Sequence, residues 1–159
     1  MLIRKYLWLA SPILSVIGMV GEAFASPLFT ITTDFGEIDS VHKVPHKGID
    51  LAMPVGTPIK SIVDGVVSSV SDTGHEGFGK SVRIVDGHGH TLILGHLSKI
   101  LVHKGEHISM GELVALSGST GHSTGPHLHL QVNINGKPVN PMPLMTASAA
   151  KKALRELLK

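Results

Sequence analysis

Histidine is abundant in this chain, and its spacing points to chemistry. The 159 residues include 11 histidines and no cysteine, so any metal ion here would be held by imidazoles and carboxylates. His127 and His129 are separated by Leu128. On a strand rising about 3.3 Å per residue, both imidazoles would point to one face about 7 Å apart, while Leu128 and Leu130 face a core. Such a pair suits a metal ligand and a catalytic partner, although exposed histidines on a half-buried strand give the same pattern.

His46 and Asp50 form a second candidate group, four positions apart. Imidazole nitrogen and carboxylate oxygen both suit zinc. Gly48 lies between them and would let the backbone bend, so the two side chains could converge without a helix. Taken alone, a histidine and an aspartate in a polar loop need no functional explanation.

His96 is the third candidate. On a regularly alternating strand it would share a face with Leu92 and Leu94, which is the usual setting of a buried core histidine. Gly95 leaves room beside the imidazole, so a functional role is the alternative.

Together these residues predict a catalytic zinc site. Two imidazoles and one carboxylate provide three ligands and leave the fourth tetrahedral position to water. Zinc lowers the pKa of that water to about 7 and polarises a carbonyl oxygen. Two further histidines could accept the proton, stabilise the oxyanion and protonate the leaving amine. The spacing leaves open which of His127 and His129 is the ligand. The sequence lacks His-Glu-x-x-His, so a helix-based zinc protease with a glutamate base is excluded.

The order of the motifs resembles that of the lysostaphin-type, or LytM-domain, metallopeptidases. The similarity runs from about Phe35 to Pro141 and so covers most of the chain that follows the first 25 residues. It rests on the segments Phe35-Gly36, His46-Lys47-Gly48-Ile49-Asp50-Leu51-Ala52, Gly56-Thr57-Pro58, Gly77-Phe78-Gly79, Gly95-His96-Leu97 and Gly121-His122-Ser123-Thr124-Gly125-Pro126-His127-Leu128-His129.

This resemblance implies one zinc ion per chain, bound by His46, Asp50 and His129, with His96 and His127 as the catalytic histidines. It also implies an endopeptidase that hydrolyses amide bonds in the stem peptides or cross-links of bacterial peptidoglycan through zinc-bound water. The alternative is a non-catalytic cell-wall adaptor that activates a separate amidase. Relatives of that kind typically lack ligands and often carry a coiled coil, whereas this chain has the full ligand set and no heptad segment.

The chain departs from the family at two places beside the expected site. Family members commonly carry Tyr-Ala-His-Leu where this chain has Leu94-Gly95-His96-Leu97, which predicts that an aromatic groove wall is missing. Glu37 follows Phe35-Gly36, where an arginine is usual. The resemblance therefore predicts the metal set more firmly than the bond that is cut.

The elements that position these residues are expected to be β-strands. Two-residue alternation punctuated by glycine runs through the chain from Ser26 onward, and short turn signals separate the alternating segments. This pattern predicts a mainly β protein, a compact antiparallel sandwich or barrel-sandwich. Apolar residues at helix spacing among lysines predict a short amphipathic helix over Ser148–Lys159. The predicted strands are Leu28–Thr32, Pro58–Val63, Val66–Val70, Ser81–Val85, Thr91–Leu97, Glu112–Ser117 and His127–Asn133.

The first 25 residues are predicted to be a secretory signal. Arg4 and Lys5 precede an apolar stretch, and Ala23-Phe24-Ala25 supplies small residues for cleavage. The expected organisation is a signal peptide at 1–25, a LytM-type domain at 26–145 and a C-terminal helix or tail at 146–159. Export, most simply to the periplasm, follows, with no stable membrane span after cleavage. A net charge of +2 and 4% aromatic residues give no basic stripe or stacking surface for nucleic acid. Peptidoglycan is the one partner that the sequence predicts.

Overall fold

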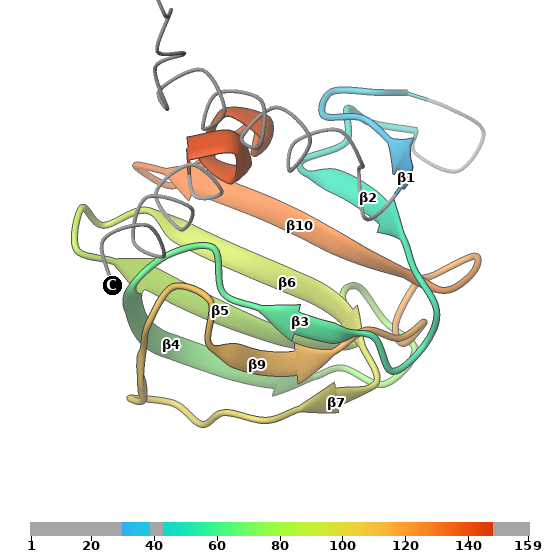
Figure 1. Ribbon diagram of the computed structural model, residues 1–159. Helices are drawn as coiled ribbons and strands as arrows, with labels where there is room; N and C mark the ends of the chain where they lie inside the picture. Colours follow the sequence, from blue (N-terminus) through green and yellow to red (C-terminus); the bar gives the residue numbers. More distant parts are fainter. Residues whose placement is uncertain (1–29, 39–42, 148–159) are drawn as a thin grey trace, which may run out of the picture.

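The computed structural model describes residues 30–38 and 43–147 (Figure 1). The predicted signal peptide and the predicted helix Ser148–Lys159 lie outside these residues, so both remain predictions. Within the described part the chain forms strands and one short helix at residues 142–147. The strands are β1 (Thr30–Thr33), β2 (Ile49–Ala52), β3 (Pro58–Lys60), β4 (Gly65–Asp72), β5 (Lys80–Asp86), β6 (Thr91–Leu97), β7 (Lys99–Ile100), β8 (His107–Ile108), β9 (Leu113–Leu116), β10 (His127–Ile134) and β11 (Lys137–Val139).

The strands form two antiparallel sheets. The larger sheet has the order β1-β2-β10-β6-β5-β4-β8, with β11 paired to β10, and the smaller has the order β3-β9-β7. Figure 1 shows the smaller sheet in front of the larger one and the helix at 142–147 beside β10. The predicted antiparallel, mainly β fold is therefore confirmed. In residues 30–38 and 43–147, no helix has the length and apolar character needed to cross a membrane.

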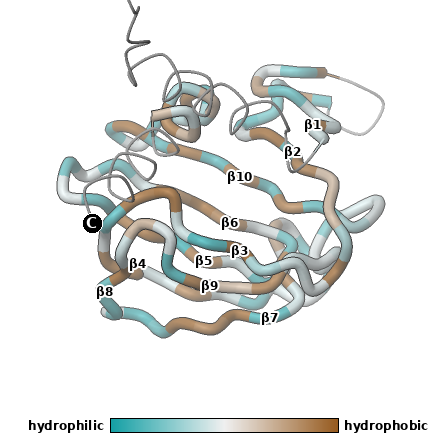
Figure 2. The backbone as a smooth tube through the Cα atoms, viewed as in Figure 1, coloured by the Kyte–Doolittle hydropathy of each residue, from teal (hydrophilic) through white to brown (hydrophobic). Residues whose placement is uncertain are grey.

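The hydrophobic core lies between the two sheets. Leu94 of β6 and Leu130 of β10 are register partners, so their side chains share a face of the larger sheet. Both are buried in one cluster with residues of the smaller sheet, among them Ile59 and Val114. Figure 2 shows hydrophobic residues alternating with more hydrophilic ones along β10. This alternation leaves the opposite face of β10 and its neighbours free to carry polar side chains.

Strand β2 was not predicted from the sequence. It is four residues long and contains Asp50, a residue that strands generally disfavour. Its pairing on both sides, with β1 and with β10, nevertheless makes it an interior strand of the sheet, and Ile49 and Leu51 are buried in the core. Tertiary pairing therefore overrides local propensity here. The very short strands β7, β8 and β11 were missed for the same reason.

We expect the core position at Leu94 to be important for stability. The side chain is 1% exposed, whereas that of Leu113 is 43% exposed. Leu94→Ala leaves a cavity and should lower the free energy of unfolding by about 2–5 kcal/mol. Leu113→Ala, the matched control, should change it by no more than about 0.5 kcal/mol. Denaturant unfolding measures both values, and equal losses in the two variants would contradict this view of the core.

Candidate metal centre and groove

Asp50 and His129 meet because β2 and β10 pair in a fixed register. The two residues are direct partners across these strands, so their side chains lie on the same face of the sheet. Asp50 Oδ1 is 2.9 Å from His129 Nδ1. His46 precedes β2, and its Nε2 lies 3.1 Å from His129 Nδ1 and 3.4 Å from Asp50 Oδ1. All three residues are buried.

These three atoms have the spacing of ligands around one metal ion. With metal–ligand distances of about 2.0–2.1 Å and tetrahedral angles, ligand atoms stand about 3.3 Å apart. The separations among His46 Nε2, Asp50 Oδ1 and His129 Nδ1 are 2.9, 3.1 and 3.4 Å. Two imidazole nitrogens and one carboxylate oxygen also match the ligand chemistry of zinc. The donor set therefore fits a tetrahedral ion with three protein ligands.

The outer ring nitrogen of each imidazole has a hydrogen-bond acceptor that favours the tautomer suited to metal binding. His46 Nδ1 donates to the carbonyl oxygen of Asp34 at 3.2 Å. His129 Nε2 lies 3.4 Å from Gln131 Oε1, and the Gln131 amide nitrogen donates to Asn133 Oδ1 at 2.8 Å. In the tautomers that keep those protons on the outer nitrogens, His46 Nε2 and His129 Nδ1 would direct their lone pairs toward a metal ion.

Gln131 and Asn133 are functional candidates that the sequence analysis missed. They lie two and four positions after His129 on β10. Two-residue spacing on a strand places them on the same face as the histidine, and that was the signal available in the sequence.

The carboxyl group of Asp50 is ionised in this setting. Burial raises its pKa, but the hydrogen bonds that His129 and His46 donate when a proton, rather than a metal ion, lies on their inner ring nitrogens outweigh that effect and hold the pKa below its usual range. A buried carboxylate is stable only when charge and hydrogen bonds compensate it. A bound cation would complete that compensation.

His96 and His127 lie beside the three candidate ligands. Their ring centroids are 4.5 Å apart, and His127 Nε2 is 3.8 Å from Asp50 Oδ1. His127 Nδ1 donates to the Gly125 carbonyl at 2.7 Å, and His96 Nδ1 donates to the Thr120 carbonyl at 2.8 Å. Each ring therefore keeps Nε2 as an acceptor. Burial lowers the pKa of His96 to about 4, so this imidazole is neutral at pH 7.

The expectation that His96 shares a face with Leu92 and Leu94 was wrong. Those leucines belong to the core, whereas His96 lines the same groove as His129 on the other face. The backbone at His96 is left-handed, with φ of 60°, and the pairing of β5 with β6 shifts register at this point. A bulge of this kind re-aims a side chain, and Leu97 after it returns to the core.

Thr120 braces the backbone that contacts His96. Its hydroxyl donates to the Leu97 carbonyl at 2.7 Å and accepts from the Lys80 amide at 3.0 Å. Two glycines with positive φ, Gly79 and Gly121, let the neighbouring loops touch backbone to backbone. A Cβ added to Gly121 would lie 2.3 Å from the Gly79 nitrogen. The loop around Gly79 and the loop around Gly121, which lie beside His96, are therefore tightly packed against each other.

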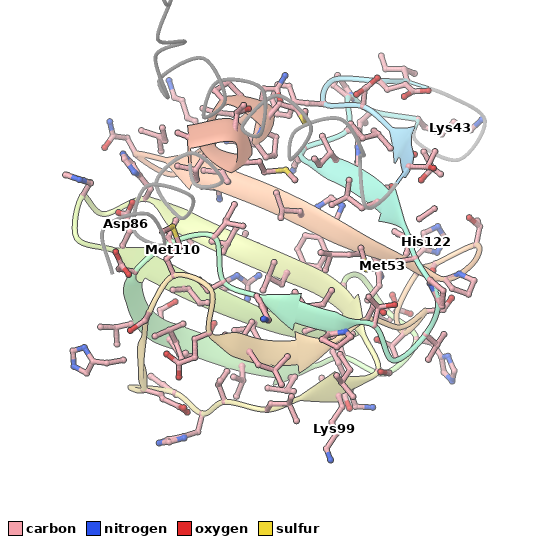
Figure 3. The ribbon with its side chains drawn as sticks, viewed as in Figure 1. Lys43, Met53, Asp86, Lys99, Met110 and His122 are labelled. Carbon is pink, nitrogen blue, oxygen red and sulfur yellow. The ribbon has the colours of Figure 1, made fainter. Side chains whose placement is uncertain are left out.

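All five histidine and aspartate candidates line one groove of about 570 Å³. Phe78 forms part of its wall, with its ring centroid 5.0 Å from that of His129. The groove therefore has an aromatic wall, although Leu94 itself lies in the core. His122, on the loop before β10, also lines the groove (Figure 3). Of the remaining histidines, His42 lies outside the described residues, whereas the exposed ones are His75, His88, His103 and His107.

The groove brings two histidines and a carboxylate around one point, with two more histidines beside them. In a mainly β domain, this arrangement is typical of a metal-dependent hydrolase. Comparison with known families agrees, because residues 44–141 match Peptidase family M23. The chain therefore belongs to peptidase family M23, a family of metallopeptidases, and the resemblance to lysostaphin-type enzymes is confirmed.

Curated relatives include a peptidoglycan DD-endopeptidase and a glycyl-glycine endopeptidase. The chain is 44% identical over 117 residues to the peptidoglycan DD-endopeptidase ShyA of Vibrio cholerae, covering 72% of this chain and 27% of ShyA. It is 38% identical over 108 residues to the glycyl-glycine endopeptidase ALE-1 of Staphylococcus capitis, covering 65% of this chain and 30% of ALE-1. The aligned part thus spans less than a third of either relative.

Solved structures share the fold over most of their catalytic domains. The catalytic domain of the M23 protein EnpA from Enterococcus faecalis, solved as a mutant, has a TM-score of 0.66 and 34% identity, covering 73% of this chain and 91% of that one. The catalytic domain of lysostaphin from Staphylococcus simulans has a TM-score of 0.64 and 31% identity, covering 74% and 92%. A zinc-containing peptidase from Vibrio cholerae has a TM-score of 0.65 and 37% identity, covering 72% and 36%.

Gly48 should be required for the geometry of the metal centre. A Cβ at this position would lie 2.4 Å from the Leu130 carbonyl oxygen and 2.9 Å from the His129 ring. Gly48→Ala should therefore displace the imidazole, weaken divalent metal binding about tenfold or more, and cost about 1–3 kcal/mol of stability. Metal titration and thermal unfolding measure the two effects. Gly87→Ala is the control, because a Cβ there meets nothing within 4 Å, and a matching loss in that variant would refute the proposed cause.

Proposed function

We propose that this protein is an exported, zinc-dependent endopeptidase that hydrolyses amide bonds in the stem peptides or cross-links of peptidoglycan. His46, Asp50 and His129 bind one zinc ion, and His96 and His127 are the catalytic histidines. The observation that carries the proposal is the convergence of the three ligand atoms within 4.8 Å of one another, in a groove that both other histidines line. The complete ligand set favours an enzyme over a non-catalytic adaptor.

The histidines supply the proton transfers of the reaction. When bound, zinc would acidify a water molecule and polarise the scissile carbonyl. His96 and His127 both hold their Nδ1 proton on a backbone carbonyl and present Nε2 as an acceptor. The imidazole that accepts the proton of the attacking water on Nε2 becomes the acid that delivers the same proton to the leaving amine.

Export follows from the substrate and from the first residues of the chain. Peptidoglycan lies outside the cytoplasm, and the segment 1–25 has the charge and apolar pattern of a secretory signal. The periplasm is the proposed location. The names of the relatives, which include a peptidoglycan DD-endopeptidase and DD-carboxypeptidase/endopeptidases, support a cell-wall substrate.

Substitution of the two β10 histidines should separate metal binding from proton transfer. His129→Ala removes a ligand, so zinc content and cell-wall hydrolysis should both be lost. His127→Ala should keep one zinc per chain and yet lose about 10²–10⁴-fold in rate, the usual contribution of an acid–base group. Metal analysis and release of fragments from purified peptidoglycan give the two readings.

His88→Ala is the control for these variants, because His88 is exposed in the β5–β6 turn away from the groove. It should retain zinc and activity. A wild-type protein without zinc, or activity that survives both β10 substitutions, would overturn the proposal. If the purified protein digested nothing but accelerated a separate amidase, the adaptor function would be correct instead.

Activity should fall with zinc content below about pH 6. Histidine binds a metal only in its neutral form, so protons displace the ion as the pH decreases. The pKa of His96 is lowered to about 4 by burial, so this residue stays neutral through most of that range. Loss of activity between pH 6 and pH 4.5 should therefore follow loss of zinc. Parallel pH profiles of bound zinc and hydrolysis test this, and full activity at pH 4.5 would argue against a histidine-bound metal.

A further inference from the structure

The charge along the groove is unevenly distributed. Among the described residues that line it, Asp50 and Lys47 are the two that carry a formal charge, histidines aside. Asp50 is buried and bonded to His129, whereas Lys47 is exposed. No ion pair joins Lys47 to any residue within 30–38 and 43–147. Its ammonium group is therefore available to a ligand in the groove.

The backbone that carries Lys47 is firmly placed. His46, directly before it, exchanges backbone hydrogen bonds with Gly36 and Glu37 at 2.8 and 3.0 Å. Gly48, directly after it, packs against Leu130 and His129 with no space for a Cβ. The backbone of Lys47 is thus held beside the candidate metal ligands, while its side chain, ending in the ammonium group, is exposed to solvent.

The rest of the groove offers no competing charge. Apart from the histidines, its other lining residues are uncharged, among them Val44, Pro45, Phe78 and the segment from Ser123 to Pro126. A divalent ion on the Asp50 carboxylate leaves one positive charge at the centre, to which Lys47 adds a second. A groove with this excess of positive charge attracts anionic ligands.

Resting on the proposed function, we infer that Lys47 binds a carboxylate of the substrate and so makes this groove selective for anionic cross-link peptides over uncharged glycine bridges. Family membership does not decide between these substrates, because the matched relatives include both a DD-endopeptidase and a glycyl-glycine endopeptidase. Lys47 is a specificity-determining residue in this inference and takes no part in the chemical step.

The test uses two synthetic cross-linked peptides that differ only in one carboxylate beside the scissile amide, free in one and amidated in the other. Lys47→Met keeps the length and apolar stem of the side chain and removes its charge. With zinc-loaded protein, kcat/KM for the carboxylate peptide should fall about fivefold, which is the upper range for an exposed ion pair. The value for the amidated peptide should stay the same.

Lys43→Met is the matched control, since Lys43 is an exposed lysine of the same segment that does not line the groove. Figure 3 shows Lys43 at the start of the described segment that leads into β2. This variant should cleave both peptides like the wild type. No change in Lys47→Met, or an equal loss on both peptides, would overturn the assignment of Lys47.

A binding measurement separates this inference from the proposed function. Calorimetry with an uncleaved carboxylate peptide should show about fivefold weaker binding to Lys47→Met than to the wild type, and equal binding of its amidated form. If the wild type cleaved neither cross-linked peptide, the proposed function would fail, and the calorimetry would still decide on Lys47. Binding that is independent of Lys47, or no binding to the wild type, would refute the inference.

Discussion

The antiparallel register between β2 and β10 is the constraint on which the candidate metal centre depends. It sets Asp50 directly opposite His129. Because side chains alternate between the faces of a sheet, a slip of one residue would turn the carboxylate toward the core and the leucines toward the groove. The buried leucines and isoleucine of the two strands specify the register, since only one alignment buries them all. Hydrophobic packing on one face of the sheet therefore determines the chemistry on the other.

The polar face is stabilised by a chain of partners for its buried groups. His46, His96, His127 and His129 each use one ring nitrogen on a neighbouring carbonyl or amide oxygen. Within the described residues, no buried side-chain polar atom lacks a hydrogen-bond partner. Such saturation fixes the imidazoles before a ligand arrives, which suits a site that must hold reacting groups within fractions of an ångström.

The sequence predicted which residues gather in the groove more successfully than how the backbone brings them there. His46, Asp50, His96, His127 and His129 do converge, although their individual roles stay predictions. Strand β2 was missed because its pairing, rather than its own residues, makes it a strand. The orientation of His96 was predicted wrongly because this residue has a left-handed backbone at a bulge, which interrupts the two-residue alternation of the strand. The local sequence does not indicate this interruption. Long-range hydrogen bonding decided both cases.

The contact between Gly79 and Gly121 has a consequence for how the enzyme can diversify. These loops are joined by main-chain hydrogen bonds and by the Thr120 hydroxyl, so most of their other side chains are not needed to hold them together. Substitutions at exposed positions such as His75 and Glu76 should therefore leave the hydrogen bond between His96 and the Thr120 carbonyl in place. The architecture separates the residues of the reaction centre from exposed loop positions, so mutation can vary these positions while the reaction centre is inherited intact.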